Sequence, residues 1–349
     1  MAILRRLLAP SLLVVAACGG AETVAVQSLT GAGATFPYPI YSQWFQQYAG
    51  ATGVQINYQS IGSGGGIRQF TEGTVDFGAT DGPMKDDQIA AVQGNVVHLP
   101  TVLGAVVLTY NLPGLGEVRL QLDGTTVADI FLGKITRWND PRLAALNPGT
   151  SLPDRDLIVV HRSDGSGTSF VFTDYLGKVS AEWTSRVGVA TSVEWPIGLG
   201  GKGNEGVTQQ VKQLEGTIGY VELVYAASNG LPVAMLQNAA GAFVEPSLAA
   251  VTAAAAGSPL MAGTDFRVSI TNAAGAEAYP IASYTWLLVK TDNPDGGKAA
   301  AIRDYLRWMV STEAQTMATQ LGYAPLPESV ADLVRTRIET LKAGGQPIP

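Results

Sequence analysis

The stretch His161-Arg162-Ser163-Asp164-Gly165-Ser166-Gly167-Thr168-Ser169-Phe170 joins two segments of contrasting pattern. Before it, residues 157–160 form a short apolar and largely β-branched run, which is typical of a buried strand. After it, apolar residues recur at helical spacing from residue 170 to residue 176. The pattern therefore predicts a strand, a tight Asp-Gly-Ser-Gly turn and a helix that begins near Thr168.

The predicted turn offers the groups that hold an oxyanion. A helix start presents unpaired backbone N–H groups and the positive end of the helix dipole. Arg162 adds a planar, permanently charged fork that suits phosphate or carboxylate. An ordinary strand-to-helix connection with a Ser or Thr N-cap explains the stretch equally well.

Two enzyme motifs are excluded at this turn. No Gly-Lys-Ser/Thr follows the glycines, so the stretch is not a Walker A loop. Asp164 stands where a nucleophile elbow needs its first glycine. His161 and Arg162 are neighbours on a strand and are predicted to point to opposite faces, so they do not share a pocket.

Three further glycine-rich turns follow or precede predicted strands and helices. They are Thr30-Gly31-Ala32-Gly33-Ala34-Thr35-Phe36-Pro37 before a helix over 39–48, Gly62-Ser63-Gly64-Gly65-Gly66 after a strand over 54–58, and Asp81-Gly82-Pro83 after a strand over 75–80. Each turn alone fits a purely structural role. Repeated strand–turn–helix units predict an α/β, doubly wound sheet, in which ligands bind beyond the carboxyl ends of the strands. Several such turns in one chain therefore predict a shared pocket.

The N-terminus reads as a signal segment over residues 1–18. Arg5 and Arg6 precede an apolar core that is too short to span a bilayer, and Cys18 follows Val15-Ala16-Ala17. This arrangement resembles the bacterial lipoprotein cleavage motif, in which the cysteine is lipidated; a plain secretory signal is the alternative. Residues 19–27 read as a tether.

Length and composition limit the number of lobes and the classes of partner that we expect. The 349 residues exceed what one core normally serves and predict two lobes. With 22 Lys and Arg against 29 Asp and Glu, and no basic run, nucleic acid is not an expected partner. Lys134, Arg137 and Arg142 could form an anion patch, but a solvated helical face is the preferred interpretation. The single cysteine excludes an intramolecular disulfide.

Several motifs occur in an order that is similar to that of the phosphate-specific ABC transporter substrate-binding proteins (PstS type). They are the three turns above with their flanking strands, Gly133-Lys134-Ile135-Thr136-Arg137-Trp138, Arg162-Ser163-Asp164-Gly165-Ser166-Gly167-Thr168, Gly201-Lys202-Gly203-Asn204-Glu205-Gly206 and Gly219-Tyr220-Val221-Glu222. The resemblance covers residues 28–325. It implies a two-lobed, type II periplasmic-binding-protein-like fold with the ligand cleft between the lobes. Lobe 1 would comprise residues 28–108 and 283–349, and lobe 2 residues 109–282.

The resemblance also implies a phosphate site. Its members would be Thr35, Phe36, Ser63, Asp81, Arg162, Ser166, Gly167 and Thr168, with Asp164 orienting Arg162. Asp81 is expected to check that the ligand is protonated, because a carboxylate only accepts hydrogen bonds and sulfate has no proton to donate.

The expected function is that of an extracytoplasmic, lipid-anchored, monomeric solute-binding protein. It would capture inorganic phosphate and deliver it to the permease and ATPase complex of an ABC transporter, without cofactor, metal or catalysis. A phosphatase-like hydrolase on the same fold and a binding protein for another tetrahedral oxyanion are the alternatives.

Overall fold

The computed structural model describes residues 26–93, 95–115, 118–257 and 265–348. The predicted signal segment, Cys18 and most of the predicted tether lie outside these residues. The fold is built on an eight-stranded mixed sheet in the order β2-β1-β3-β11-β4-β8-β6-β7. Its strands are β1 (Ser28–Gly33), β2 (Gln55–Ser60), β3 (Phe77–Thr80), β4 (Val97–Asn111), β6 (Ile158–Arg162), β7 (Leu199–Gly201), β8 (Thr217–Glu222) and β11 (Ala282–Val289).

Two groups of parallel strands flank an antiparallel centre. Strands β2, β1 and β3 are parallel to one another, as are β8, β6 and β7, whereas β11 and β4 run antiparallel to their neighbours. Each parallel group forms the sheet of one lobe, so the two-lobed α/β expectation is confirmed. The parallel strands of each group bring their carboxyl ends to one edge, where ligand sites form.

Strand β4 runs through both lobes. Its residues 97–105 pair with β11, and its residues 106–111 pair with β8. The two separate strands predicted over 96–100 and 104–110 were wrong in this respect, because the chain continues straight through Pro100. A register shift between Thr285 and Trp286 lies opposite Pro100, and such a bulge accommodates a residue that has no N–H to donate. The lobe boundaries near residues 108 and 283 remain a prediction.

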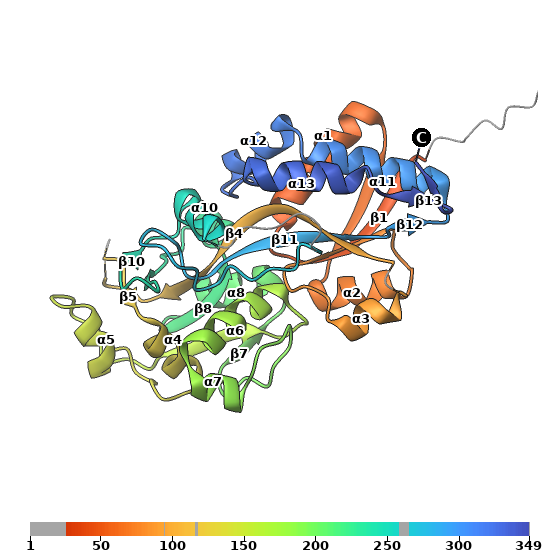
Figure 1. Ribbon diagram of the computed structural model, residues 1–349. Helices are drawn as coiled ribbons and strands as arrows, with labels where there is room; N and C mark the ends of the chain where they lie inside the picture. Colours follow the sequence, from red (N-terminus) through yellow and green to blue (C-terminus); the bar gives the residue numbers. More distant parts are fainter. Residues whose placement is uncertain (1–25, 94, 116–117, 258–264, 349) are drawn as a thin grey trace, which may run out of the picture.

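Helices cover both faces of the lobe 1 sheet (Figure 1). Helices α1, α11, α12 and α13 lie on one side, and α2 and α3 lie on the other. Their bounds are α1 (Tyr38–Thr52), α2 (Ser63–Thr71), α3 (Asp86–Ala91), α11 (Gly296–Met309), α12 (Thr312–Leu321) and α13 (Glu328–Ile338). A small sheet of β12 (Asp292–Asn293), β13 (Lys342–Ala343) and β14 (Gln346–Pro347) closes this lobe.

The remaining elements lie at the left and at the bottom of Figure 1, around β8, β6 and β7. They are α4 (Gly124–Phe131), α5 (Pro141–Leu146), α6 (Gly167–Val179), α7 (Ala181–Arg186), α8 (Gly203–Gln213), α9 (Leu223–Ser228), α10 (Leu248–Ala256), and a second sheet of β5 (Gln121–Leu122), β9 (Met235–Gln237) and β10 (Phe243–Val244). The predicted glycine-rich loop over 198–206 is instead β7 and the start of α8. Helix α8 therefore begins four residues before the predicted Val207, at Gly203.

Aromatic clusters hold the elements that carry the site. In lobe 1, the predicted apolar stripe of α1 is buried, and its Tyr41 and Phe45 pack on Tyr58 of β2. In lobe 2, Phe172 of α6 stacks on Tyr220 of β8 with ring centroids 4.3 Å apart. Such pairs contribute about 0.5–1.5 kcal/mol each beyond the area they bury. They fix the strand ends and helix starts relative to each other.

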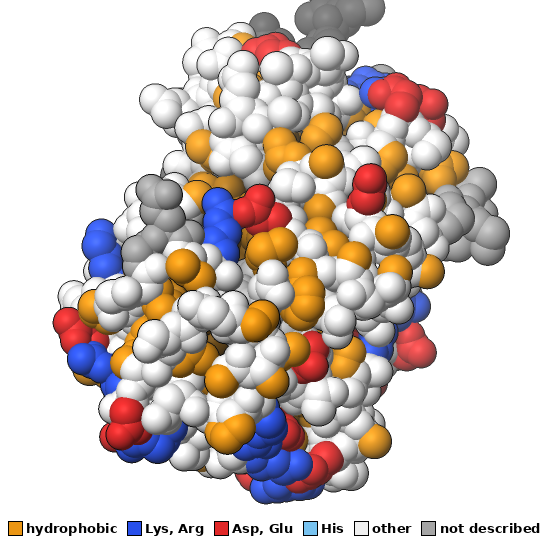
Figure 2. Space-filling model, turned by 90° about the vertical axis from the view of Figure 1, so that its left-hand side faces the viewer, with side chains coloured by type: hydrophobic (Ala, Val, Ile, Leu, Met, Phe, Trp, Pro, Cys, Tyr) orange, Lys and Arg blue, Asp and Glu red, His pale blue; other side chains and the backbone are white. Residues whose placement is uncertain are grey.

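The three basic side chains considered as an anion patch, Lys134, Arg137 and Arg142, are ion-paired. Lys134 contacts Glu182, Arg142 contacts Asp129, and Arg137 contacts Asp154 at 2.6 Å. Figure 2 shows basic and acidic side chains side by side at the lower end of the molecule. These contacts support a solvated face over an anion patch. No helix of the described ranges combines the length and the apolar character that a bilayer crossing needs.

Candidate functional site

The side chains predicted to bind an anion are buried where the lobes meet. Thr35 and Arg162 are 2% exposed, Asp81 is 1% exposed, and Ser63, Ser166 and Thr168 are fully buried. They lie at the carboxyl end of β6 and in the loops and helix starts that follow β1, β2, β3 and β6. A polar set of this size is buried only where its hydrogen bonds are satisfied or reserved for a ligand.

Arg162 is held by its neighbours before any ligand arrives. Its Nε donates to Asp164 Oδ1 at 2.8 Å and its Nη2 to Asp164 Oδ2 at 2.6 Å. Its Nη1 donates to Thr168 Oγ1 at 3.3 Å. Burial acts to raise the pKa of Asp164, but Arg162 and the N–H of Gly203 outweigh it and hold that pKa below its usual value. The contacts fix the guanidinium plane, and three of its five N–H donors are used in doing so.

Two helix starts meet beside Arg162. Ser166 caps α6 by accepting a bond from the N–H of Ser169 at 2.9 Å, which leaves Gly167 and Thr168 in the first turn. Ser63 opens α2 after Gly62, whose φ of 87° favours glycine. Helix starts present unpaired N–H groups and a positive dipole end. The arrangement is therefore suited to an anion.

The lobes touch at these helix starts. A Cβ atom added to Gly167 would lie 2.4 Å from Ser63 Oγ and 2.5 Å from Asp81 Oδ2. The N–H of Gly64 also donates to the carbonyl of Gly165 at 2.8 Å, from one lobe to the other. The structure is thus a closed form, in which α6 of lobe 2 contacts α2 and the end of β3 in lobe 1.

Asp81 is the acceptor among these donors. Its Oδ1 accepts a bond from Thr285 Oγ1 at 2.8 Å, and its N–H donates to Ser63 Oγ at 3.2 Å. Its Oδ2 is buried and has no hydrogen-bond partner among the described residues. Burial raises the pKa of Asp81 to about 7, although Thr285 and Arg162 act to lower it. A buried carboxyl oxygen without a partner invites a hydrogen-bond donor from a ligand.

Thr35 and Phe36 are anchored through their carbonyl groups. Tyr225 Oη donates to the carbonyl of Thr35 at 2.5 Å, and Tyr323 Oη donates to that of Phe36 at 2.7 Å. The two tyrosines belong to α9 and to the loop after α12, so the Thr35 loop is fixed from both lobes. Neither tyrosine was predicted as a site residue, because nothing in the local sequence marks partners that lie 190 and 287 residues away.

Glu222, at the end of β8, was also missed as a residue of this region. It is fully buried, and burial raises its pKa well above the usual value. Its Oε2 lies 3.2 Å from Tyr323 Oη, whose single proton goes to the carbonyl of Phe36. The same Oε2 accepts a bond from the backbone N–H of Val224 at 2.9 Å, so the Glu222 side chain joins the start of α9 to this chain of contacts. Its position in the family-like stretch 219–222 was the only available signal.

The other titratable candidates have structural roles. His98 Nε2 accepts a bond from the N–H of Met84 at 3.0 Å, which confirms its place in the core. His161 stacks on Trp195 with centroids 5.0 Å apart, away from the pocket, as predicted. Within the described ranges, no group of three or more His, Cys, Asp or Glu side chains is placed to hold a metal ion.

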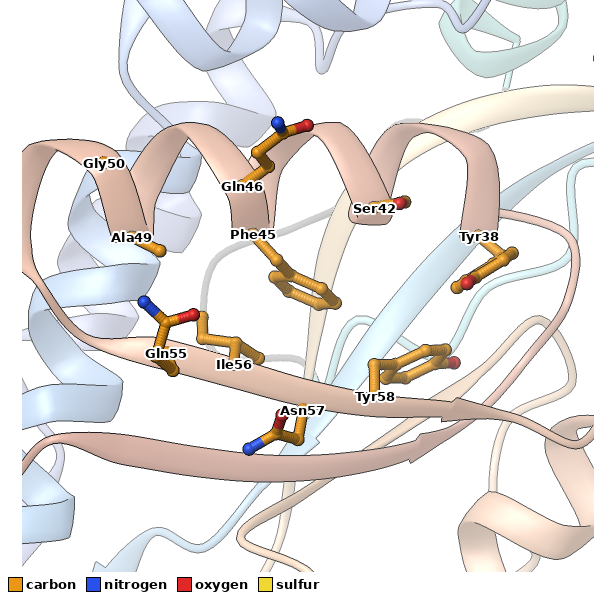
Figure 3. Close-up of a pocket in the computed structure, with 10 residues that line it drawn as sticks. All are labelled: Tyr38, Ser42, Phe45, Gln46, Ala49, Gly50, Gln55, Ile56, Asn57 and Tyr58. Carbon is orange, nitrogen blue, oxygen red and sulfur yellow. The ribbon is translucent and has the colours of Figure 1, made fainter.

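A separate hollow lies on the outer side of lobe 1 (Figure 3). It runs between α1 and β2, and the rings of Tyr38, Phe45 and Tyr58 face it. None of the predicted site residues lines this hollow. It is open to solvent and lacks the charged and buried groups of the site between the lobes.

Comparison with known proteins identifies the family and the fold. Residues 20–313 match the family model of the PBP superfamily domain. Phosphate-binding protein PstS of Xylella fastidiosa (strain 9a5c) is 46% identical over 310 residues, which cover 89% of this chain and 84% of that protein. Phosphate-binding protein PstS of Pasteurella multocida (strain Pm70) is 46% identical over 320 residues, covering 92% of each. The fold is also similar to a solved structure of the periplasmic phosphate-binding protein PfluDING bound with phosphate, with a TM-score of 0.72. The two sequences are 23% identical, and the match covers 88% of this chain and 93% of that chain.

Two α/β lobes with a buried, donor-lined site at their junction define the class of periplasmic-type binding proteins. The family model covers most of the chain and supports this class. Within the class, the chain belongs to the PstS family of phosphate-binding proteins.

Proposed function

We propose that this protein captures inorganic phosphate between its lobes, outside the cytoplasm, and delivers it to the permease and ATPase complex of an ABC transporter. The single observation that carries the proposal is the pairing of a buried cage of donors with one free acceptor, Asp81 Oδ2. The names of the relatives support the same ligand.

The donors account for affinity. Arg162, the N–H groups at the starts of α2 and α6 and the hydroxyls of Thr35, Ser63 and Thr168 would each reach an oxygen of a tetrahedral anion. Charge-assisted hydrogen bonds are roughly twice as strong as neutral ones, and burial shields them from water. Asp164 prepares Arg162 for this contact without leaving its own charge unpaired.

Asp81 accounts for selectivity. Above about pH 7, where Asp81 is ionised, phosphate still retains a proton and can donate it to Asp81 Oδ2, whereas sulfate has none. Two acceptors that face each other in a site without water weaken binding by about 1–3 kcal/mol or more. That difference corresponds to roughly 5-fold to 150-fold in affinity. Sulfate would therefore be rejected by repulsion instead of by size.

Capture would follow from closure of the lobes. Strands β4 and β11 lie at the centre of the sheet, and β4 passes from one lobe to the other. Bending of these strands would open the contact between Gly64 and Gly165 and admit the anion. The closed form buries the ligand until it reaches the permease.

The attachment of the protein to a membrane is the finer part of the proposal. Val15-Ala16-Ala17-Cys18 supports cleavage before Cys18 and lipidation of its thiol. We further propose that the mature protein is a monomer. Mass spectrometry of the mature protein from its native membrane would test the anchor, and sedimentation of the soluble form would test the monomer. A mature N-terminus elsewhere, without lipid, contradicts the anchor.

Isothermal titration of residues 19–349 with phosphate, arsenate and sulfate tests the function. We expect phosphate and arsenate, which both retain a proton, to bind, and sulfate to bind at least about tenfold more weakly. Equal binding of sulfate, or no heat with phosphate, would contradict the proposal. Turnover of a generic phosphomonoester by the same preparation would instead support a hydrolase.

A further inference from the structure

Asn204 lies at the centre of the hydrogen bonds between the lobes, although no motif singled it out as a ligand-site residue. It is the second residue of α8 and is fully buried. Its Nδ2 donates to Thr35 Oγ1 at 2.7 Å and to Thr168 Oγ1 at 3.1 Å. Its backbone N–H also donates to Thr35 Oγ1, at 3.2 Å. Asn204 therefore contacts one threonine of each lobe.

The orientation of the Asn204 amide is fixed by its other end. Its Oδ1 accepts a bond from the backbone N–H of Glu222 at 2.9 Å. A backbone N–H can only donate, so the atom that faces Glu222 must be the oxygen and the atom that faces the threonines must be the nitrogen. The amide is a donor toward both threonine hydroxyls.

A threonine hydroxyl has one proton to donate and two lone pairs that accept. Thr35 Oγ1 accepts twice from Asn204. Thr168 Oγ1 accepts once from Asn204 and once from Arg162 Nη1. With their lone pairs engaged, both hydroxyls must direct their protons elsewhere. A phosphate held by Arg162 and the start of α6, as proposed above, would offer acceptor oxygens to these protons.

We propose that Asn204 is a positioning and specificity-determining residue, which sets the hydroxyls of Thr35 and Thr168 as obligate donors to the bound anion. This inference rests on the proposed phosphate function and deepens it. Without Asn204, either hydroxyl could turn and accept a proton from the ligand. With Asn204 in place, Asp81 remains the acceptor that distinguishes a protonated ligand oxygen from an unprotonated one.

The same contacts link ligand polarity to closure. Asn204 belongs to lobe 2 and Thr35 to lobe 1, so the bonds between them form only when the lobes are together. Thr168 belongs to lobe 2, as Asn204 does, so closure is not required for the bond between them. The donor set toward the anion is therefore complete only in the closed form, which favours closure around an anion that accepts from both sides.

A double-mutant cycle tests whether Asn204 acts through the two hydroxyls. Phosphate affinity is measured by titration for the wild type, Asn204→Ala, the pair Thr35→Val with Thr168→Val, and the combination of all three. We expect Asn204→Ala to weaken phosphate binding about tenfold or more. In the valine background the same substitution should change affinity less than about threefold, because the hydroxyls it positions are gone.

Asn238→Ala is the matched control. Asn238 is also buried in lobe 2, and its amide holds the carbonyls of Gly275, Ala276 and Ala278, which lie outside the site. This variant should lose thermal stability and keep its phosphate affinity. If Asn204→Ala does not fold, Asn204→Asp replaces it in the cycle, since it retains the acceptor for Glu222.

Two results overturn the inference. One is an Asn204 variant that binds phosphate within twofold of the wild type. The other is an equal loss of affinity in the wild-type and valine backgrounds, which is what a merely structural role would produce. A wild-type protein that binds no phosphate would instead overturn the proposed function, so the two failures are distinguishable.

Discussion

At the scale of single residues, the site depends on a few buried polar atoms whose partners are already assigned. Arg162 is engaged by Asp164, Thr35 by Asn204 and Asp81 Oδ1 by Thr285. What remains is a set of donors and the buried acceptor oxygen Asp81 Oδ2, which has no partner among the described residues. The protein therefore fixes the orientation of these polar groups before the ligand binds, which lowers the entropic cost of ordering them.

Asp81→Asn is expected to weaken the rejection of sulfate. The amide of asparagine can present N–H to a sulfate oxygen, so the facing acceptors disappear. We expect the ratio of phosphate to sulfate affinity to fall by about tenfold or more. Competition titrations measure this ratio. The control is Asp76→Asn, just before β3, where the carboxylate pairs with Lys298 and the affinity ratio should stay unchanged. If Asp81→Asn also leaves the ratio unchanged, the role of Asp81 is refuted.

The sequence predicted part of the site because some of its residues follow local rules. Arg162, Ser166 and Ser63 lie at strand-to-helix turns, where glycine spacing and helix starts can be read directly. Asn204 and Tyr323 could not be found this way. Their partners are Thr35, 169 residues before Asn204, and Phe36, 287 residues before Tyr323, and only the tertiary fold brings these pairs together.

At the scale of elements, closure of the two lobes depends on how closely α6 can approach α2 and β3. Gly167 has no side chain, and any Cβ there would overlap Ser63 Oγ and Asp81 Oδ2. We expect Gly167→Ala to weaken phosphate binding about tenfold or more, because burying the extra methyl would force the lobes apart.

Scattering and titration together test this steric account. Small-angle X-ray scattering with saturating phosphate should show Gly167→Ala to be more open than the wild type. Gly50→Ala is the control, since it lies on α1 with nothing near its Cβ position, and alanine there should stabilise the helix by about 0.5–1 kcal/mol. Wild-type affinity and compaction in Gly167→Ala would show that the contact does not limit closure.

Periodicity predicted most elements, and its failures have physical causes. The stripe of α1, strand β6 and the start of α6 near Thr168 follow patterns confined to one element. Strand β4 was divided in two because Pro100 and Gly104 usually interrupt strands. The bulge opposite Pro100 and the ring of Phe36 against Gly104 explain why both residues stand inside one strand, and neither contact is visible in local sequence.

At the scale of the whole molecule, buried carboxyls give the ligand-free protein a defined pH dependence. Asp81 has a pKa of about 7 in the folded state, against 3.8 ordinarily, and the pKa of Glu222 is also raised. Between about pH 4 and 7, the native state holds a proton on Asp81 that the unfolded chain has released. Stability should therefore fall as pH rises through this window, by up to about 4 kcal/mol from Asp81.

Thermal unfolding between pH 4 and 8, without phosphate, measures this slope. Glu222→Gln and Asp81→Asn should each flatten this slope, because an amide has no proton to release in this pH range. The exposed Glu313→Gln should follow the wild type. If stability rises over this window in the wild type, and both variants leave the slope unchanged, the two carboxyls are not protonated in the folded protein.

The measurement that tests the central claim most directly is a crystal structure of the phosphate complex. We predict one phosphate between the lobes, with Asp81 Oδ2 about 2.5–2.7 Å from one of its oxygens, a short bond between a hydroxyl and a carboxylate. The remaining oxygens should accept from Arg162, Thr35, Ser63 and the start of α6. Phosphate bound elsewhere, or an Asp81 that does not contact it, would contradict the account.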